Sequence, residues 1–252
     1  MWRWWNLPRV PEPEVMNEAD EVEAYASAAA EAYLRQIDET FVRHACRLVG
    51  GTARGLALDV GTGPGQIVLR LAECLPGWRF VGVDRSARMI ARARTSAASL
   101  PGDRAARVHF FVADGNSLPF DNATFDLVLC NSVLHHLHNP ERVLSELLRV
   151  ARPGAAFLLR DLRRPTRLAF PLHVRWYGRH YSGRMYELYC ASVRAAYTAE
   201  ELERLVQLTG MPGVSVFRFG ATHIGIERPL LGHAKAPAVA REGERGPESG
   251  IL

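Results

Sequence analysis

The sequence predicts an α/β protein with a doubly wound, mostly parallel sheet of seven strands and helices on both faces. Two observations predict it. Five short apolar runs alternate with helical stretches, as parallel strands joined by crossover helices do. Two more apolar runs, residues 214–219 and 223–227, are joined around Gly220 and predict a C-terminal antiparallel hairpin. A helical cap is expected at the N-terminal end, before the first strand.

The strands are expected where the five apolar runs lie: residues 56–60, 80–84, 108–112, 125–130 and 155–159. Helices are expected between them, over residues 67–75 and 87–96 and from Pro140. Asn139 is the expected N-cap of this last helix, with proline at its first position. Thr198 and Glu201 have the spacing of a capping box, which predicts another helix before the hairpin.

Composition divides the chain of 252 residues into three parts. Residues 1–16 contain three prolines and predict an extended arm. Residues 17–228 are expected to form a single domain, in which residues 160–194 are inserted as a lid on the substrate side. Residues 229–252 have little to bury and predict a disordered tail.

The formal net charge of +4 is concentrated in one segment. Lys235 is the only lysine, so the basic residues are almost all arginines, which reflects codon usage more than function. Residues 160–194, however, contain eight arginines against two acids, Asp161 and Glu187. A local excess of this kind predicts a local anionic partner.

Cysteine spacing and the N-terminus bear on the compartment. The four cysteines lie far apart and lack metal-ligand spacing, so we expect a reduced cytoplasmic protein without a bound metal. No apolar run is long enough for a secretory signal or a membrane span. Trp2, Trp4 and Trp5 would suit a membrane interface, but we expect them to pack on the domain or on a partner, and we predict no membrane partner.

Polar residues, mostly acids, follow one predicted strand after another. Because the carboxyl ends of parallel strands meet at one edge of a sheet, these side chains should surround a common ligand site. They are Asp59, Asp84, Asp114, Asn131 and Asp161.

The glycine-rich turn after the first strand distinguishes between two kinds of ligand. Gly61 and Gly63 fit the first two glycines of a dinucleotide-binding fingerprint. The fingerprint requires its third small residue at position 66, where this chain has Gln66, and the third glycine comes one residue earlier, at Gly65. Asp59 would also repel a pyrophosphate and favour a cationic ligand. The turn therefore argues against a nicotinamide-dependent oxidoreductase.

Several segments resemble the Rossmann-like S-adenosylmethionine-dependent methyltransferases. They are DVGTGPG over residues 59–65, VGVD over 81–84, ADG over 113–115, FDLVLCN over 125–131 and LHHL over 134–137. The resemblance covers about residues 20–228. RVARPG over residues 149–154 and TAEEL over 198–202 are similar to the branch with small-molecule acceptors. The resemblance implies S-adenosylmethionine as cofactor.

The resemblance also assigns cofactor contacts, to Asp59, Gly61, Gly63, Gly65, Asp84, Met89, Asp114, Gly115 and Asn131. The glycine backbone would allow close approach of the methionine and ribose portions. Asp84 would accept both ribose hydroxyls. Asp114 and Gly115 would contact the adenine, with Met89 beside it, and Asn131 would lie near the methionine amino group.

These cofactor residues also have structural interpretations. Asp84 could cap the following helix, and Asp114 and Asn131 could be turn residues. Met89 could belong to the core, and Asp59 could order the glycine loop.

Catalysis needs few protein groups here, because a sulfonium already activates the methyl carbon. A general base is required only for an acceptor that must lose a proton early, such as a hydroxyl or thiol. The candidates are His136, after the fourth strand, and His180, in the basic segment. His135 and His223 are further histidines that could act.

The basic segment interleaves arginines with aromatic residues. Because it follows the fifth strand, we expect it to cover the methyl-donor site and bind an acceptor with an anionic and a flat portion. The candidate substrate residues are Arg175, Tyr177, Arg179 and Tyr181. The alternative is a solvated helical cap whose aromatic residues simply pack.

We therefore predict a methyltransferase with a small-molecule acceptor. The alternatives are an RNA methyltransferase, since basic and aromatic residues together suit RNA, and a non-catalytic S-adenosylmethionine-binding protein. A ubiquinone/menaquinone-type assignment is not made, because Val133-Leu-His-His stands where those enzymes have Gly-Leu-Arg-Asn.

Overall fold

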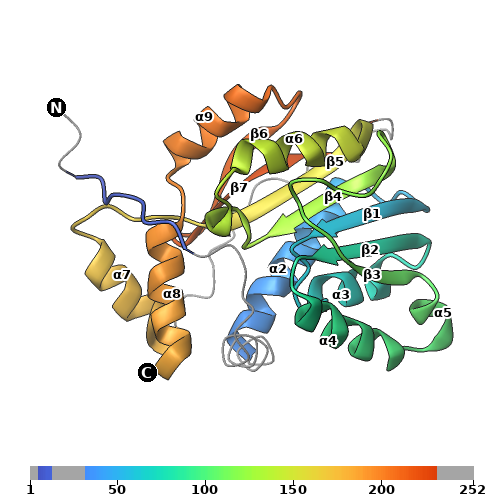
Figure 1. Ribbon diagram of the computed structural model, residues 1–252, viewed down its shortest axis with the longest axis horizontal. Helices are drawn as coiled ribbons and strands as arrows, with labels where there is room; N and C mark the ends of the chain where they lie inside the picture. Colours follow the sequence, from blue (N-terminus) through green and yellow to red (C-terminus); the bar gives the residue numbers. More distant parts are fainter. Residues whose placement is uncertain (1–4, 13–31, 232–252) are drawn as a thin grey trace.

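The computed structural model describes residues 5–12 and 32–231, and it confirms the predicted fold class. Seven strands form one sheet in the order β3-β2-β1-β4-β5-β7-β6 (Figure 1). β1 to β5 are parallel, and β7 runs antiparallel to both β5 and β6. The strands are β1 (Gly55–Val60), β2 (Trp78–Asp84), β3 (Val108–Val112), β4 (Phe125–Asn131), β5 (Ala151–Leu162), β6 (Ser215–Phe219) and β7 (His223–Arg228).

Helices cover both faces of the sheet and bury two large apolar clusters. One face packs against α2 (Ala32–Leu48), α3 (Gln66–Cys74) and α4 (Ala87–Ala98). The other face packs against α6 (Pro140–Val150) and α9 (Ala199–Thr209). Crossover helices on both faces leave the carboxyl ends of β1 to β5 open at one edge, which is where a ligand can bind.

The predicted capping residues act as expected. The side chain of Asn139 accepts the amide hydrogen of Arg142 and begins α6. Thr198 and Glu201 form the capping box of α9, which ends at Gly210 in the left-handed conformation.

β5 is longer than the sequence suggests, and this moves the start of the lid. The strand continues past residue 159 because Arg160, Asp161 and Leu162 pair with Gly225, Ile224 and His223 of β7. These residues therefore belong to the sheet. Four short elements are not predicted by the sequence: α5 (Gly102–Ala105), the 3₁₀ turns η1 (Leu134–His136) and η2 (Gly178–His180), and α7 (Phe170–Tyr177).

A two-helix lid lies beyond the carboxyl ends of the parallel strands (Figure 1). It consists of α7, the 3₁₀ turn η2 (Gly178–His180) and α8 (Gly183–Ala195), and it has a small apolar cluster of its own around Val174, Tyr189 and Val193.

The described part of the N-terminal arm, residues 5–12, crosses this lid. Asn6 bridges to Thr166, the amide of Val10 donates to the carbonyl of Arg194, and Leu7 is buried. The rest of the predicted arm, the start of the helical cap and residues 232–252 of the predicted tail lie outside the described residues. Within the described residues, no helix is long and apolar enough to cross a membrane.

Candidate active site

A cleft at the carboxyl ends of β1, β2, β3 and β4 gathers most of the predicted cofactor residues. About 900 Å³ of empty space lies within it, including the part that is open to solvent. The predicted residues that line it are Gly61, Gly63, Asp84, Met89, Asp114, Gly115 and Asn131. Asp59 and Gly65 are not among the lining residues.

The glycine loop between β1 and α3 has a backbone that other residues would strain. Gly61 has a φ of +73°, and a Cβ atom there would lie 2.3 Å from Val133 Cγ2. Gly65, at the N-cap of α3, has a φ of +86°, and its Cβ would lie 2.7 Å from Phe110. Gly61 therefore keeps the wall of the cleft close to Val133, and Gly65 lets α3 pack on the sheet.

Asp84 closes the end of β2 and holds the loops on both sides of it. Its Oδ2 accepts the amide hydrogen of Gly63 at 2.9 Å, and its Oδ1 accepts that of Ser86 at 2.8 Å. Burial raises the pKa of Asp84, and these two amides partly oppose the rise. Ser86, not Asp84, is the N-cap of α4.

Asp114 presents a carboxylate at the other end of the cleft. Its Oδ1 accepts hydrogens from the backbone and side-chain amides of Asn116 at 2.9 Å. These hydrogen bonds, led by the backbone amide, hold the pKa of Asp114 below its ordinary value, so the group is ionised near neutral pH.

Asp59 lies in β1 beneath the glycine loop. Its side chain is buried, and burial raises the pKa of Asp59 to about 7. This position is consistent with a residue that orders the loop.

Arg160 supports the cleft from inside the sheet. Its guanidinium is buried and donates to Asn131 Oδ1 at 3.2 Å, to Thr40 Oγ1 at 2.7 Å and to the Ile37 carbonyl at 3.0 Å. It also lies over the ring of Phe41, 4.9 Å from the centroid. Arg160 therefore orients Asn131 and ties α2 to β5.

A second pocket adjoins the cleft and shares Ser132 and His136 with it. About 700 Å³ of empty space, including the part that is open to solvent, lies in it between α2, the lid and the end of β5. Its walls are mostly apolar or aromatic. The lining residues are Tyr33, Leu34, Ile37, Ser132, His135, His136, Leu162, Tyr181, Met185, Leu188, Tyr189, Ser192, Thr222 and His223. Ser132, at the junction, has a φ of +57°, and such rare backbone conformations gather at functional sites.

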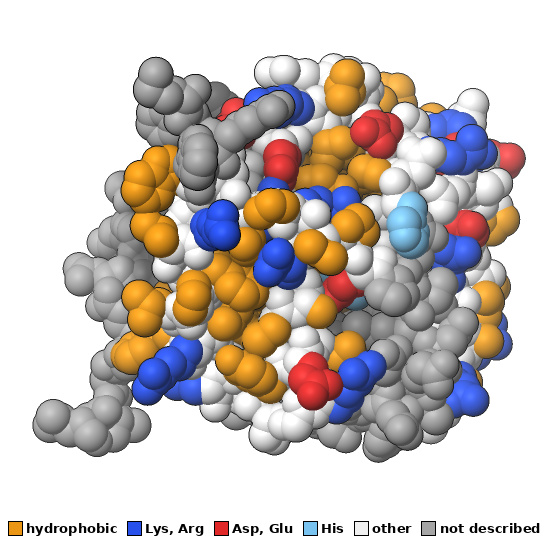
Figure 2. Space-filling model, turned by 60° about the vertical axis from the view of Figure 1, so that its left-hand side comes forward, with side chains coloured by type: hydrophobic (Ala, Val, Ile, Leu, Met, Phe, Trp, Pro, Cys, Tyr) orange, Lys and Arg blue, Asp and Glu red, His pale blue; other side chains and the backbone are white. Residues whose placement is uncertain are grey.

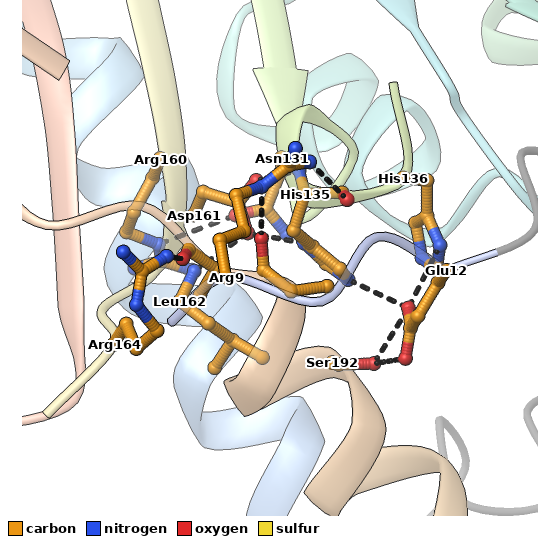
Figure 3. Close-up of polar contacts among 12 residues, drawn as sticks. Arg9, Glu12, Asn131, His135, His136, Arg160, Asp161, Leu162, Arg164 and Ser192 are labelled. Carbon is orange, nitrogen blue, oxygen red and sulfur yellow. Dashed lines mark hydrogen bonds and ion pairs between the residues drawn. The ribbon is translucent and has the colours of Figure 1, made fainter. Parts of the chain in front are cut away.

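A cluster of acids and histidines includes His135 and His136, which line the second pocket, and Figure 3 shows its polar contacts. His135 Nδ1 lies 2.5 Å from Asp161 Oδ1, and its Nε2 lies 3.8 Å from Glu12 Oε2. The same Glu12 oxygen lies 3.0 Å from His136 Nδ1. Ser192 donates its hydroxyl hydrogen to Glu12, so the arm, η1, β5 and α8 all meet here.

The pKa values of the two histidines in this cluster are shifted in opposite directions. Burial alone would lower the pKa of His135, but the Asp161 carboxylate outweighs it and holds this pKa above its ordinary value. Burial and then His135 lower the pKa of His136, against a smaller opposing influence of Glu12. His136 is therefore neutral near pH 7 and able to accept a proton.

Glu12, His135 and His136 each offer one ligand atom, and these atoms lie within 4.8 Å of one another. This spacing could hold a metal ion. In this structure, however, the same atoms interact with one another and with Ser192, which accounts for the cluster without a metal.

The predicted substrate residues are only partly brought to the pocket. Tyr181 lines it, whereas Arg175, Tyr177 and Arg179 do not. His180 also lies outside the lining but stacks on Tyr33, with ring centroids 4.0 Å apart.

The sequence does not predict the places of Glu12 and of the α2 residues in the second pocket's surroundings, because no local pattern connects them to the strand ends. Met185, Leu188 and Ser192 have helical spacing in the sequence, but that spacing does not show that this face of α8 lines a pocket.

Comparison with known proteins agrees with this geometry. Residues 58–159 match the family described as "Methyltransferase domain". A demethylmenaquinone methyltransferase of Thermus thermophilus is 32% identical over 185 residues, which are 68% of this chain and 82% of the relative. The demethylmenaquinone methyltransferase of Tropheryma whipplei is 27% identical over 77% of this chain and 82% of its own length.

Solved structures share the fold. The plantazolicin methyltransferase BpumL, crystallised with a substrate analogue and SAH, has a TM-score of 0.62 at 19% identity, covering 79% of this chain and 74% of its own. A SAM-dependent methyltransferase from Aquifex aeolicus has a TM-score of 0.61 at 17% identity, covering 86% of this chain and all of that one.

The sheet order, the glycine loop and the acids of the cleft define an S-adenosylmethionine-dependent methyltransferase. The chain belongs to the family of these enzymes that act on small molecules. The resemblance found in the sequence is confirmed, and neither the RNA nor the non-catalytic alternative is supported.

The chemistry of the cleft fits the cofactor. S-adenosylmethionine offers hydroxyl and amino hydrogens, and two carboxylates that can accept such hydrogens, Asp84 and Asp114, face the cleft. The glycine backbone at Gly61 and Gly63 leaves room for a ligand to approach closely.

Proposed function

We propose that this enzyme methylates a flat, largely apolar ring that carries a hydroxyl group, held in the pocket beneath the lid. The observation that carries the proposal is the junction of the two pockets at His136 and Ser132. A methyl donor in the cleft and a ring in the acceptor pocket would meet there, so the site would align the two reactants.

The lining of the acceptor pocket supports a ring. Tyr33, Tyr181 and Tyr189 contribute aromatic surface, and Leu34, Ile37 and Leu162 are among its aliphatic residues. Flat rings are well held by aromatic side chains. No arginine is among the described lining residues, so this pocket favours an apolar acceptor over an anionic one.

We assign the cofactor contacts as follows. Asp84 accepts the ribose hydroxyls, and Asp114 and the amide of Gly115 contact the adenine, with Met89 beside it. The backbone of the loop from Gly61 lies along the methionine portion, and Asn131 lies near its amino group. Asp59 and Gly65 act by supporting the loop.

His136 is the proposed general base. When bound, S-adenosylmethionine supplies a methyl carbon activated by its sulfonium. Because His136 Nδ1 donates to Glu12, its Nε2 keeps the lone pair that can accept the hydroxyl proton of the acceptor. Glu12 then stabilises the imidazolium that forms.

The names of the relatives agree with this acceptor class. The Thermus thermophilus relative is called a demethylmenaquinone methyltransferase, a name that gives a quinone, which is a flat ring, as its acceptor. Val133-Leu-His-His marks a local difference at the junction, so we propose the class of acceptor and not that molecule.

We also propose a single methyltransferase domain over residues 17–228, with the lid as its acceptor-binding part. The large core clusters extend through the sheet and its helices without interruption, which supports one domain.

The test is methylation of a chainless reduced naphthoquinone by the purified enzyme, followed by mass spectrometry. Product with the hydroxylated ring, and none with an amine-terminated peptide, is the expected result. His136→Asn should lower kcat by about 100-fold and leave cofactor affinity unchanged. His138→Asn, exposed and two residues away, is the matched control. Methylation of the peptide but not of the hydroxylated ring would overturn the proposal.

A further inference from the structure

The outer side of the lid carries an exposed apolar surface that the methyl-transfer site does not use. Leu168, Leu172 and Trp176 follow one another at spacings of four residues and are 67%, 73% and 56% exposed. Trp5 of the arm is 55% exposed, and its carbonyl accepts the amide hydrogen of Arg167, the residue before Leu168. We call these four residues and the arginines Arg167, Arg175 and Arg179 the α7 face.

The α7 face is one side of an amphipathic element. Phe170, Val174 and Tyr177 point inward and pack against the apolar cluster of α8. Leu172 and Trp176, on the other side of α7, have no such cover. Figure 2 shows hydrophobic side chains gathered on the side of the molecule that carries the lid, with basic side chains among them. Monomeric proteins rarely leave such a patch exposed without a use.

Residues 166–179 contain three arginines and no acidic residue. Arg167, Arg175 and Arg179 are exposed, and none forms an ion pair with a residue of the described ranges. Arg179 lies over the Trp176 ring, 4.3 Å from its centroid, so a cation and an aromatic ring share one position. Tryptophan, leucine and arginine together are the side chains that settle at a membrane–water interface, where guanidinium groups meet lipid phosphates.

We propose that the α7 face docks on an anionic lipid surface. The apolar side chains would enter the interfacial region, and the three arginines would contact lipid phosphates. The sequence led us to expect no membrane partner, since it has no spanning segment, but a surface contact needs only an amphipathic face. Trp5, expected to pack on the domain or on a partner, is exposed.

Docking on lipid would extend the proposed function, and this part of the inference rests on that function. An apolar ring acceptor partitions into lipid, and the inner side of α8 lines the acceptor pocket through Met185 and Leu188. The lid would then separate the lipid surface on its outer side from the acceptor pocket on its inner side.

The experiment is sedimentation of the full chain with vesicles, without any acceptor. Wild type should bind vesicles of equal parts phosphatidylcholine and phosphatidylglycerol, and binding should weaken as salt is raised. Pure phosphatidylcholine should bind about tenfold less. The double variant Leu172→Ser, Trp176→Ser should bind the anionic vesicles about tenfold less than wild type.

Leu208→Ser is the matched control, because Leu208 is equally exposed but lies on α9, and it should bind as wild type does. Cofactor affinity of each variant, measured by calorimetry, confirms that it is folded. With a water-soluble acceptor, the double variant should turn over at the wild-type rate.

Three outcomes would overturn the inference. The first is that wild type does not bind the anionic vesicles, and the second is that the double variant binds them as well as wild type does. The third is that the protein does not bind vesicles but forms a dimer in sedimentation velocity, which Leu172→Ser dissociates. Vesicle binding by an enzyme that fails to methylate hydroxylated rings would refute the proposed function and leave this inference standing.

Discussion

Glu12 contacts two histidines and one serine through a single carboxylate. It is held in place because Arg9, three residues before it, donates to the carbonyls of Ala195 and His135. A side chain fixed this firmly can set the tautomer of His136. Glu12 is therefore a positioning residue, and its effect should appear in the pH profile.

Glu12→Gln should move the acidic limb of kcat/KM to lower pH. The proposed base works when His136 is neutral, so the rate rises with pH through its pKa, which burial already holds below the ordinary value. Glu12 favours the imidazolium, and its loss lowers that pKa further. The value of kcat should fall about tenfold, as for other residues that orient an imidazole. The measurement is kcat/KM from pH 4.5 to 8.

Glu141→Gln, an exposed acid at the start of α6, serves as the control and should leave the profile unchanged. If the acidic limb of Glu12→Gln stays where it is, Glu12 does not act on the base. Chelators should have no effect on wild type. An activity that EDTA removes and Zn²⁺ restores would make the cluster a metal site.

Asp84→Ala should weaken S-adenosylmethionine binding by about 100-fold, the loss expected for two charge-assisted hydrogen bonds. Part of the loss would come from the amides of Gly63 and Ser86, which Asp84 also holds. Asp84→Asn should therefore bind with intermediate affinity. Calorimetry measures both, with exposed Asp103→Ala as control. Unchanged affinity in Asp84→Ala would remove this residue from the cofactor site.

At the scale of single residues, the sequence predicts the positions of those residues that secondary structure and sheet topology place. Asp84, Asp114 and Asn131 end strands, and parallel strand ends meet at one edge, so their convergence follows from topology. Glu12 reaches the same place through a tertiary contact between the arm and α8. Nothing near Glu12 in the sequence carries that information.

Among the elements, β5 and α9 show how the charge of the basic segment is used. Arg164 is buried directly after β5 and donates to Glu201 Oε1 at 2.6 Å. The other oxygen of Glu201 accepts the amide hydrogen of Thr198 at 2.9 Å, in the capping box of α9. One carboxylate therefore caps a helix and neutralises a buried guanidinium.

Glu201→Ala should lower the free energy of unfolding by about 2 kcal/mol, because it leaves Arg164 buried without its partner and removes half of the capping box. The partial exposure of Glu201 keeps the loss below that of a fully buried pair. Urea denaturation measures it, with Glu203→Ala, exposed on the same helix, as control. Equal stability of the two variants would show that the Arg164 pair contributes nothing.

The net charge of residues 160–194 does not predict that some of their arginines are buried and paired within the protein. Of the arginines that make residues 160–194 basic, Arg160 and Arg164 are buried, Arg163 donates to the Ala221 carbonyl and Arg194 is partly buried. Only exposed members such as Arg175 and Arg179 remain for a partner. Net charge does not depend on burial, whereas the availability of a charge does.

The whole molecule joins a large core to a small lid. The two main clusters bury the sheet between its helices, whereas the buried part of the lid cluster is Val174, Tyr189 and Val193. The lid is tied to the rest by the arm and by the contact of α8 with η1. Because local stability follows buried apolar contact, α7 and α8 should open more easily than the sheet.

Hydrogen exchange measured by mass spectrometry should therefore show amides of α7 and α8 exchanging about 100-fold faster than those of β1, β4 and α6. An acceptor analogue should slow exchange in α8, which lines the pocket, and in α2 through Ile37, with a smaller effect on α9. S-adenosylmethionine alone should protect the glycine loop and leave the lid unchanged. If cofactor and acceptor protect the same amides, the two pockets do not act as separate sites. If the lid exchanges as slowly as the sheet, the acceptor must enter by a route that needs no opening of α7 and α8.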